Sequence, residues 1–430
     1  MVNRRNFFKL AGSAAMAASP ITQILTKTSE LGDGYRNKIF QSHPIDESIK
    51  DEDFWYQVRM AFTVFPGMIN LNNGGVSPSP KIVQEAVERY NKLSNEAPSY
   101  YMWRILDQGR EPLREKLSKL AGCDAEELAI NRNASEALET IIFGLRLNKG
   151  DEVVLTKQDY PNMINAWKQR EKRDGIVLKW VDLMLPIEDD DAIVGAYTQV
   201  FSDKTKLVHI THIINWTGQI IPARKIADIA HKKGIEVLVD GAHSFVHINY
   251  TIKDLDCDYF GTSLHKWLCA PIGSGMLFVK KDKISKLYPL FGAGDPESSD
   301  IRKFENLGTR SFPIEQGIAE AIDFQNMLGM ERKEKRLRYL KNYWANQVSD
   351  LPGVRLNTSL KDEFSCAIAN FSIKDKKLED IDATLFNKYK IHTVGINWEN
   401  IHGVRVTPNV YTLTSDLDRL VKSIKELTTS

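Results

Sequence analysis

The feature that most constrains the fold is a regular alternation of short apolar segments with longer amphipathic segments between residues 127 and 239. The apolar segments predict β-strands at 127–130, 152–155, 176–181, 206–211 and 236–239, with one more at 276–279. The segments between them have helical spacing and predict helices at 135–147, 162–173, 192–201 and 223–233. Strands that alternate with helices of this length form a mainly parallel sheet with helices on both faces, so we expect a large α/β domain.

Ligands of such a sheet bind beyond the carboxyl ends of its strands. Three predicted strand ends bring polar residues to that edge: the loop after Ile130, the pair Asp159-Tyr160, and Asp240. We therefore expect these segments to meet in one crevice.

The pattern changes after Ile284, where charged helices predominate and strand-like segments are few. Helices are predicted within 308–328, 332–349 and 416–427, and strands at 366–372 and 403–406. This mixture predicts a second, smaller α+β domain. The expected organisation is a signal and linker over 1–30, an N-terminal segment over 31–70, a large domain over 71–290 and a small C-terminal domain over 291–430.

The chain is electrically balanced, with 57 basic and 56 acidic residues among 430. This balance gives no electrostatic reason to expect nucleic acid or an anionic membrane as a partner, so we expect a small molecule or a second copy of the chain. The four cysteines are scattered without metal-ligand spacing, which predicts buried thiols and no metal site.

The N-terminus carries Arg4 and Arg5, two aromatic residues, a lysine and then a weakly apolar stretch over 11–18. This order is typical of a twin-arginine export signal, with a candidate cleavage site at 15–17, and the alternative is a basic, frayed terminus. The signal predicts an exported or periplasmic protein and the twin-arginine translocase as a partner. That route carries proteins that have already folded in the cytoplasm. No stretch of the sequence approaches a membrane span.

Asp240 ends an apolar strand, His243 follows three residues later, and Lys266 comes 26 positions after Asp240. An enzyme needs this order to hold pyridoxal phosphate: the lysine amine forms a Schiff base, and the aspartate keeps the pyridine nitrogen protonated. Singly, each residue has a plainer interpretation, as a solvated carboxylate, a core histidine and a surface lysine. The apolar segment 267–271 beside Lys266 predicts a lowered lysine pKa, which favours the cofactor interpretation.

The segment 131–137 opens a predicted helix directly after a strand. Unpaired N–H groups and the helix dipole make such a terminus suited to phosphate, with the backbone of Ala134 and the hydroxyl of Ser135 as candidate ligands. The alternative is an ordinary helix cap.

The chain resembles class V aminotransferase-fold enzymes of the pyridoxal-phosphate fold type I group, and most closely the isopenicillin N epimerase-like branch. The resemblance covers Leu71 to the C-terminus. It rests on Leu71-Asn72-Asn73-Gly74, Asn133-Ala134-Ser135-Glu136, Asn215-Trp216-Thr217-Gly218, Asp240-Gly241-Ala242-His243, Ser263-Leu264-His265-Lys266, Gly308-Thr309-Arg310 and Gly403-Val404-Arg405-Val406.

The resemblance implies a role for each matching residue. Lys266 would form the Schiff base and Asp240 would hold the pyridinium nitrogen, while His243 and Asn215 would approach the ring hydroxyl. The phosphate would be held by Ala134, Ser135, Ser263 and His265. Thr309 would reach the phosphate of a neighbouring subunit, which implies a homodimer. Arg405 would bind the substrate carboxylate, and the alternative for it is a surface ion pair.

Two positions depart from the cysteine desulfurase pattern. Where desulfurases stack a histidine on the cofactor ring, this chain has Tyr160, which can stack and can also move a proton. The alternatives are a tyrosine packed on the surface, or an alignment slipped by one residue that places Asp159 there. The segment 395–402 lacks the mobile cysteine that desulfurases need, and Cys366 lies in an apolar segment and is expected to be core.

These residues predict an enzyme that acts at the α-carbon of an amino acid or a peptide-like amine. Epimerase or racemase activity is favoured by the resemblance, while aminotransferase and C–S β-lyase activities stay open because all three begin with removal of the α-proton. A desulfurase and a binding protein without turnover are the weaker alternatives.

Overall fold

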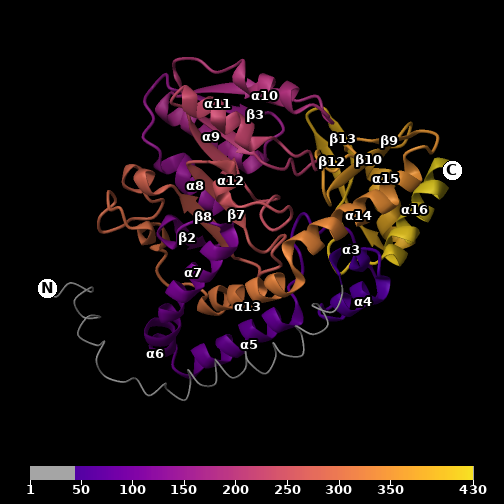
Figure 1. Cartoon of the computed structure of the whole chain (residues 1–430), viewed down its shortest axis with the longest axis horizontal. Coiled ribbons are helices and arrows are strands. Elements are labelled where there is room, and N and C mark those ends of the chain that lie inside the picture. Colours follow the sequence, from indigo (N-terminus) through magenta and orange to yellow (C-terminus); the bar gives the residue numbers. More distant parts are fainter. Residues whose placement is uncertain (1–43, 430) are drawn as a thin grey trace. The chain divides into compact units, whose positions relative to one another are not determined.

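The computed structural model describes residues 44–429, and the chain from Ser48 onward packs as one compact unit. The predicted export signal lies outside the described residues. The large domain is built on a seven-stranded sheet in the order β2-β8-β7-β6-β5-β3-β4 (Figure 1). Its strands are β2 (Leu128–Asn131), β3 (Glu152–Thr156), β4 (Val177–Val181), β5 (Thr205–Thr211), β6 (Glu236–Asp240), β7 (Tyr259–Ser263) and β8 (Gly275–Val279).

The sheet is mainly parallel, as the sequence predicts. Strands β4, β3, β5, β6 and β7 pair in parallel, and only β8 runs antiparallel to its neighbours β7 and β2. Helices that connect these strands are α8 (Ala134–Gly144), α9 (Pro161–Asp174), α10 (Asp190–Thr198) and α11 (Ala223–Lys232).

Both faces of the sheet are buried, which explains why its strands are continuously apolar. Val154, Val237 and Val239 belong to one core cluster, together with residues of α10 and α11. Their neighbours in the strands, Leu155 and Leu238, belong to a second cluster with residues of α8 and α9. This two-residue alternation places a separate helical layer on each face.

The helix α13 (Phe312–Leu328) packs against α5 (Lys81–Glu96) and α7 (Arg110–Ala121). It lies within the predicted range 308–328 and begins at Phe312, with Pro313 in its first turn, where proline is favoured. The helix α8 ends earlier than predicted, at Gly144, where a Cβ would lie 2.1 Å from the carbonyl oxygen of Tyr288.

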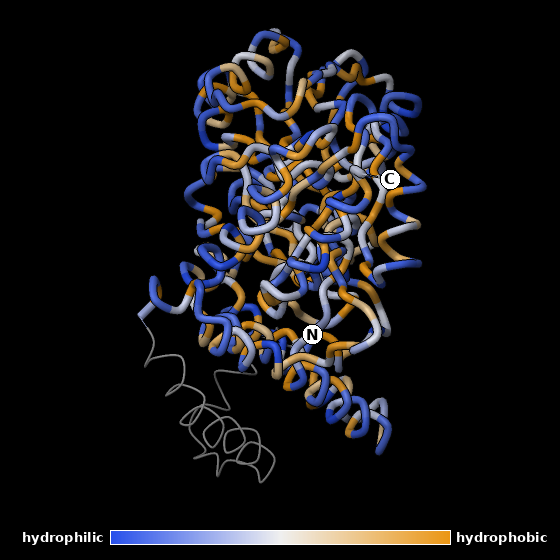
Figure 2. Tube along the Cα trace, turned by 90° about the vertical axis from the view of Figure 1, so that its right-hand side faces the viewer, coloured by the Kyte–Doolittle hydropathy of each residue, from blue (hydrophilic) through white to orange (hydrophobic). Residues whose placement is uncertain are grey.

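The C-terminal part has its own sheet, in the order β12-β13-β10-β9, and all its pairings are antiparallel. Its elements are α14 (Met330–Val348), β9 (Val354–Leu356), β10 (Ala369–Ile373), α15 (Leu378–Tyr389), β12 (Val394–Trp398), β13 (Ile401–Val406) and α16 (Thr414–Thr429). A third core cluster fills the space between this sheet and these helices. Figure 2 shows apolar and polar residues alternating along the outer helices, as expected where one side of a helix faces a core.

Two smaller elements connect the ends of the chain. The strand β1 (Ile69–Asn70) pairs in parallel with β11 (Ile391–His392), and the helix α4 (Glu52–Met60) precedes it. The segment after β1 is thereby brought to the C-terminal sheet, where the backbone N–H of Thr407 donates to the carbonyl oxygen of Leu71 at 2.7 Å. The predicted domain boundaries are not decided by these contacts and stay a prediction.

Candidate active site

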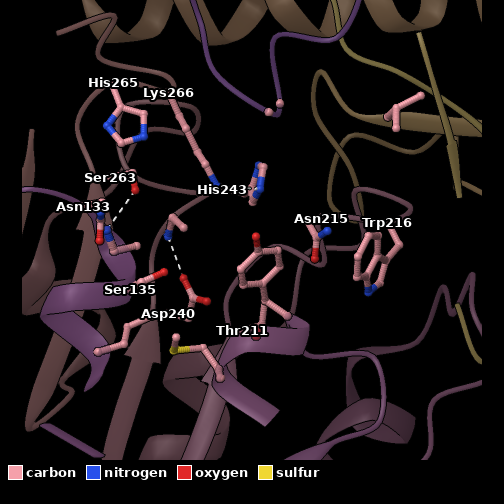
Figure 3. Close-up of a pocket in the computed structure, with 18 of the residues that line it drawn as sticks. Asn133, Ser135, Thr211, Asn215, Trp216, Asp240, His243, Ser263, His265 and Lys266 are labelled. Atoms are coloured by element: carbon pink, nitrogen blue, oxygen red, sulfur yellow. Dashed lines mark hydrogen bonds between the residues drawn. The ribbon is translucent and has the colours of Figure 1, made fainter. Parts of the chain in front are cut away.

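A cavity of 510 Å³ opens at the carboxyl ends of the parallel strands, where the sequence predicts it (Figure 3). Ten of the predicted site residues line it: Ala134, Ser135, Tyr160, Asn215, Asp240, His243, Ser263, His265, Lys266 and Arg405. They come from the ends of several strands, from the start of α8 and from β13. Of the predicted set, only Thr309 lies outside the cavity.

One end of the cavity is formed by the N-terminus of α8. Asn133 caps this helix, its side-chain oxygen accepting the N–H of Glu136 at 2.9 Å. The N–H of Ala134 donates to the hydroxyl of Ser263 at 2.8 Å, which ties the helix start to the end of β7. A Cβ at Gly275 would lie 2.6 Å from the backbone nitrogen of Asn133, so the helix start needs a glycine beside it. The hydroxyl groups of Ser135 and Ser263, together with the N–H groups and the dipole at the start of α8, suit this end of the cavity to a phosphate.

His265 lies near the same end and is half-buried. Its Nδ1 lies 3.0 Å from the carbonyl oxygen of Ser274, a geometry that fixes Nδ1 as the protonated nitrogen. Burial lowers the pKa of His265.

Lys266 is half-buried, and its Nζ lies 3.1 Å from Nε2 of His243. Burial lowers the lysine pKa to about 8; Arg405 acts in the same direction and Asp240 opposes both. The lowered pKa predicted from the apolar neighbours is thereby confirmed. The pKa of His243 lies well below its usual value, because of burial first and of Lys266 and Arg405 next, so His243 is neutral.

The loop that carries Lys266 is held by two residues that the sequence analysis missed. His247 stacks on Trp267 with ring centroids 3.7 Å apart, and its Nδ1 donates to the carbonyl oxygen of His243 at 2.6 Å. Lys333 of α14 is 2% exposed and donates to the carbonyl oxygen of Trp267. The sequence offers one hint of His247, its position four residues after His243, and that spacing does not indicate which groups His247 contacts. It offers no comparable hint of Lys333.

Asp240 ends β6 and is 4% exposed. One carboxylate oxygen accepts the N–H of Ala242 at 2.8 Å, while the side chain faces the cavity. Burial raises its pKa, and His209 and Lys266 oppose this shift. His209, which the sequence analysis also missed, is fully buried and accepts the indole N–H of Trp167 at 3.0 Å. Its other ring nitrogen therefore carries the proton.

The structure separates the roles of Asp159 and Tyr160. Asp159 is fully buried and accepts hydrogen bonds from the hydroxyls of Thr156 and Thr211 at 2.8 and 2.7 Å. Burial raises its pKa to about 6. Tyr160 is 40% exposed and lines the cavity, so it is the tyrosine, and not the aspartate, that can face a ligand.

Arg405 is 6% exposed and reaches the cavity from β13. Its guanidinium donates to the carbonyl oxygen of Asn215 at 3.1 Å and to the side-chain oxygen of Asn72 at 2.9 Å. Within residues 44–429 no carboxylate forms an ion pair with it, so the alternative of a surface ion pair is wrong. Burial lowers its pKa to about 10, which leaves it positively charged at neutral pH. A buried cation bonded only to neutral oxygens is suited to an anionic ligand.

Asn215 is 3% exposed, and its side-chain oxygen has no hydrogen-bond partner within the described chain. That oxygen can accept from a ligand hydroxyl, as its predicted role requires. Thr309 is exposed and lines a separate cavity of 210 Å³ with Arg132 and Gly273. Its predicted contact is with a neighbouring subunit, and it stays a prediction.

None of the four cysteines lines the cavity. Cys257, Cys269 and Cys366 are buried and Cys123 is half-buried, and burial raises the pKa of both Cys123 and Cys366 to about 12. Cys366 is core, as the sequence predicts. Among residues 44–429 no group of three acidic, histidine or cysteine side chains is arranged to hold a metal ion. No helix in the same range is long and apolar enough to cross a membrane.

The sequence model of the aminotransferase class-V family matches residues 69–395. The isopenicillin N epimerase of Streptomyces clavuligerus is 27% identical over 391 residues, which cover 87% of this chain and 98% of the epimerase. A probable cysteine desulfurase of Halalkalibacterium halodurans is also 27% identical, over 403 residues that cover 86% of this chain and 97% of that protein.

Solved structures share the fold. The cysteine desulfurase CsdA of Escherichia coli is 21% identical with a TM-score of 0.76, covering 86% of this chain and 97% of its own. A mutant of C-DES with glycine covalently linked to the pyridoxal phosphate cofactor is 20% identical with a TM-score of 0.77, covering 86% of this chain and 99% of its own.

Proposed function

The chain belongs to the class-V aminotransferase family, and within it we propose an amino-acid racemase or epimerase, similar to isopenicillin N epimerase. It is an enzyme of fold type I whose cofactor is pyridoxal 5'-phosphate. The proposal concerns the reaction and the residues that carry it.

The cavity suits this cofactor in its chemistry and its size. The N-terminus of α8, which is suited to a phosphate, lies at one end; Asp240 would offer a buried carboxylate to the pyridine nitrogen, and the amine of Lys266 could bind the aldehyde. The cavity volume of 510 Å³ falls in the range of about 300–1,000 Å³ typical of small-molecule sites. When bound, pyridoxal phosphate withdraws electrons from the α-carbon of an amino acid and so makes the α-proton acidic.

The protein's part of the reaction is to hold the carboxylate and to move the proton. Arg405, charged and without an acidic partner in the described chain, would bind the substrate carboxylate. Burial lowers the pKa of Lys266 to about 8, so about a tenth of its amine is neutral at pH 7 and can take the α-proton. Asp240 is buried beside it, and its negative charge favours a positive ring nitrogen.

One observation favours racemisation: two proton carriers from unrelated elements line one cavity. Lys266 follows β7, whereas Tyr160 precedes α9, and no hydrogen bond to another residue of the described chain ties the Tyr160 hydroxyl. Loss of chirality needs a proton returned on the face opposite to its removal, and a second carrier meets that need. His243 is the alternative carrier, since it also lines the cavity, although its Nε2 lies 3.1 Å from Lys266 Nζ and Tyr160 is therefore favoured for the opposite face.

Incubation of the holoenzyme with single amino acids in deuterated water tests the proposal. Deuterium at the α-carbon with loss of optical activity is the expected result. An oxo-acid product would indicate transamination, and pyruvate with ammonia would indicate a β-lyase. Absence of α-exchange with every amino acid would refute α-carbon chemistry.

Desulfurase activity is disfavoured by the C-terminal hairpin. The strands β12 and β13 join through a two-residue turn, Glu399–Asn400, and the hairpin carries no cysteine. Sulfide release that disappears in Cys366→Ala would overturn this inference.

Two further proposals concern the setting of the enzyme. Thr309, exposed and outside the cavity, is available to a second subunit, so we propose a homodimer. Arg4 and Arg5 support export by the twin-arginine translocase to the periplasm.

A further inference from the structure

Three aromatic rings form a row that begins in the cavity: Tyr160 and Trp216 line it, and Trp398 lies behind Trp216. Trp216 stacks on Trp398 with ring centroids 5.6 Å apart at 26°, and Tyr160 lies 6.5 Å from Trp216 at 32°. In Figure 3, Ser135 and Ser263 lie at one side of the view and Trp216 at the other, with His243 and Lys266 between them. Trp216 therefore lies on the side of the cavity toward which the part of a substrate beyond the reacting carbon would extend.

The strand β12 extends this wall with apolar side chains. Val394, Ile396 and Trp398 alternate along the strand and so share one of its faces; the first two line the cavity and the third stacks on Trp216. The end of the cavity nearest the row is thus lined by rings and branched aliphatic side chains.

The wall is held in place by hydrogen bonds between the hairpin and the large domain. The indole N–H of Trp398 donates to the carbonyl oxygen of Lys157 at 2.9 Å. At the turn, the side-chain N–H of Asn400 donates to the carbonyl oxygen of Leu183 at 3.0 Å, and its oxygen accepts from Gln158 at 3.3 Å. The platform is preformed, so a ligand that stacks on it does not have to order it first.

The cavity offers no free charged group that could pair with an ionised side chain of a substrate. Its lining holds one carboxylate, Asp240, and two basic side chains other than histidine, Lys266 and Arg405. Under the proposed function, the cofactor uses the first two and the substrate carboxylate uses the third. A charged substrate side chain would lose its hydration against an apolar wall without gaining a partner.

We infer that Trp216, Val394 and Ile396, with Trp398 behind Trp216, form a subsite for a flat, uncharged side chain, so that the substrate is an aromatic amino acid. The reaction of such a substrate rests on the proposed function, whereas the binding surface rests on the contacts described above. Stacking and burial of one ring predict that phenylalanine is turned over with a kcat/KM about tenfold or more above that of alanine. Glutamate and lysine should be poorer than alanine.

Binding of carboxylates without an amine tests the subsite apart from the reaction. Calorimetric titration of the holoenzyme with 3-phenylpropionate, propionate and glutarate should give an affinity about tenfold or more higher for the phenyl compound. In Trp216→Ala that preference should fall by about tenfold, whereas Trp216→Phe should keep most of it. Trp180→Ala, which removes a half-buried tryptophan from β4 outside the cavity, is the matched control and should keep the preference.

Should Trp216→Ala fail to fold, Val394→Ala provides the second test, with an expected loss of about threefold in phenylpropionate affinity and no change for propionate. Equal affinity for phenylpropionate and propionate, or α-exchange with alanine or glutamate as fast as with phenylalanine, would overturn the subsite and leave the proposed reaction standing. Preferential binding of phenylpropionate without α-exchange of any amino acid would support the subsite and refute the proposed reaction.

Discussion

Replacing Arg405 by methionine should separate the stability of the fold from the binding of substrate. Burial lowers the pKa of Arg405 from 12.5 to about 10, a shift worth about 3 kcal/mol against the charged form. Because the folded-state pKa is depressed, this penalty is present in full at every pH below about 10 and is lost only as the pH rises through the unfolded value. Methionine removes the penalty but leaves two oxygens, of Asn215 and Asn72, without their donor, at about 1 kcal/mol each.

The two terms nearly cancel, so the variant should unfold within about 2 °C of the wild type or above it. Substrate binding should suffer instead, because loss of one partner of a buried charge pair costs about 2–5 kcal/mol, or a KM about 30-fold or more higher. Differential scanning calorimetry and α-proton exchange measure the two effects.

Arg114→Met is the matched control for Arg405→Met. Arg114 is 1% exposed, like Arg405 nearly buried, but it pairs with Glu305 at 2.8 Å. Its loss removes one of the two arginines that pair with the buried carboxylate of Glu305, with Arg110 remaining at 3.0 Å, so this variant should melt several degrees lower with an unchanged KM. A melting temperature of Arg405→Met that falls as far as that of Arg114→Met, or a KM within threefold of the wild type, would refute the assignment of Arg405 as a carboxylate site.

Three more outcomes are expected. In the cofactor-free protein, labelling of Lys266 by an amine-directed reagent, followed by peptide mass spectrometry, should increase with pH because only the neutral amine reacts. The midpoint should lie near pH 8, and a midpoint near 10.5 would contradict the inference that burial lowers the pKa of Lys266. Tyr160→Phe should slow racemisation by about 100-fold or more while deuterium exchange at the α-carbon continues, and loss of chirality at the wild-type rate would exclude Tyr160 as the second proton carrier. Replacing Arg4 and Arg5 together by lysine should keep the protein in the cytoplasm on cell fractionation, and an unchanged location would count against the export proposal.

The large domain could be predicted because its pattern is local. Apolar segments such as 152–155 and the helices between them carry their periodicity in a few consecutive residues. The strand β7 escaped prediction because it contains Gly261, which ordinarily weakens a strand. Its glycine is needed for a distant reason: a Cβ there would lie 2.8 Å from the side chain of Leu138 in α8. The short strands β9 and β12 were missed because they are stabilised by pairing across the small sheet rather than by their own sequence.

The site residues also fall into those that local sequence patterns indicate and those that only the fold brings together. Asp240 and Lys266 could be predicted because the signals are adjacent in the sequence: Asp240 ends an apolar strand, and Lys266 directly precedes the apolar segment 267–271. His209, His247 and Lys333 could not, because each acts through a contact with a residue more than 20 positions away or through a backbone carbonyl. The choice between Asp159 and Tyr160 likewise needed the two threonine hydroxyls that hold Asp159 inside.

Overall similarity does not decide the reaction, because relatives named as an epimerase and as a probable desulfurase are equally distant at 27% identity. Our proposal therefore depends on local features, and these lie on the hairpin of β12 and β13. Its two-residue turn leaves no room for a mobile loop, it carries no cysteine, and the side chain of Asn400 fastens its tip to the large domain. A hairpin fixed in this way cannot deliver a nucleophile to the substrate, but it can present Val394, Ile396 and Trp398 as a rigid wall. Under the two proposals, the same hairpin would both disfavour attack on sulfur and form the apolar wall against which the substrate side chain packs.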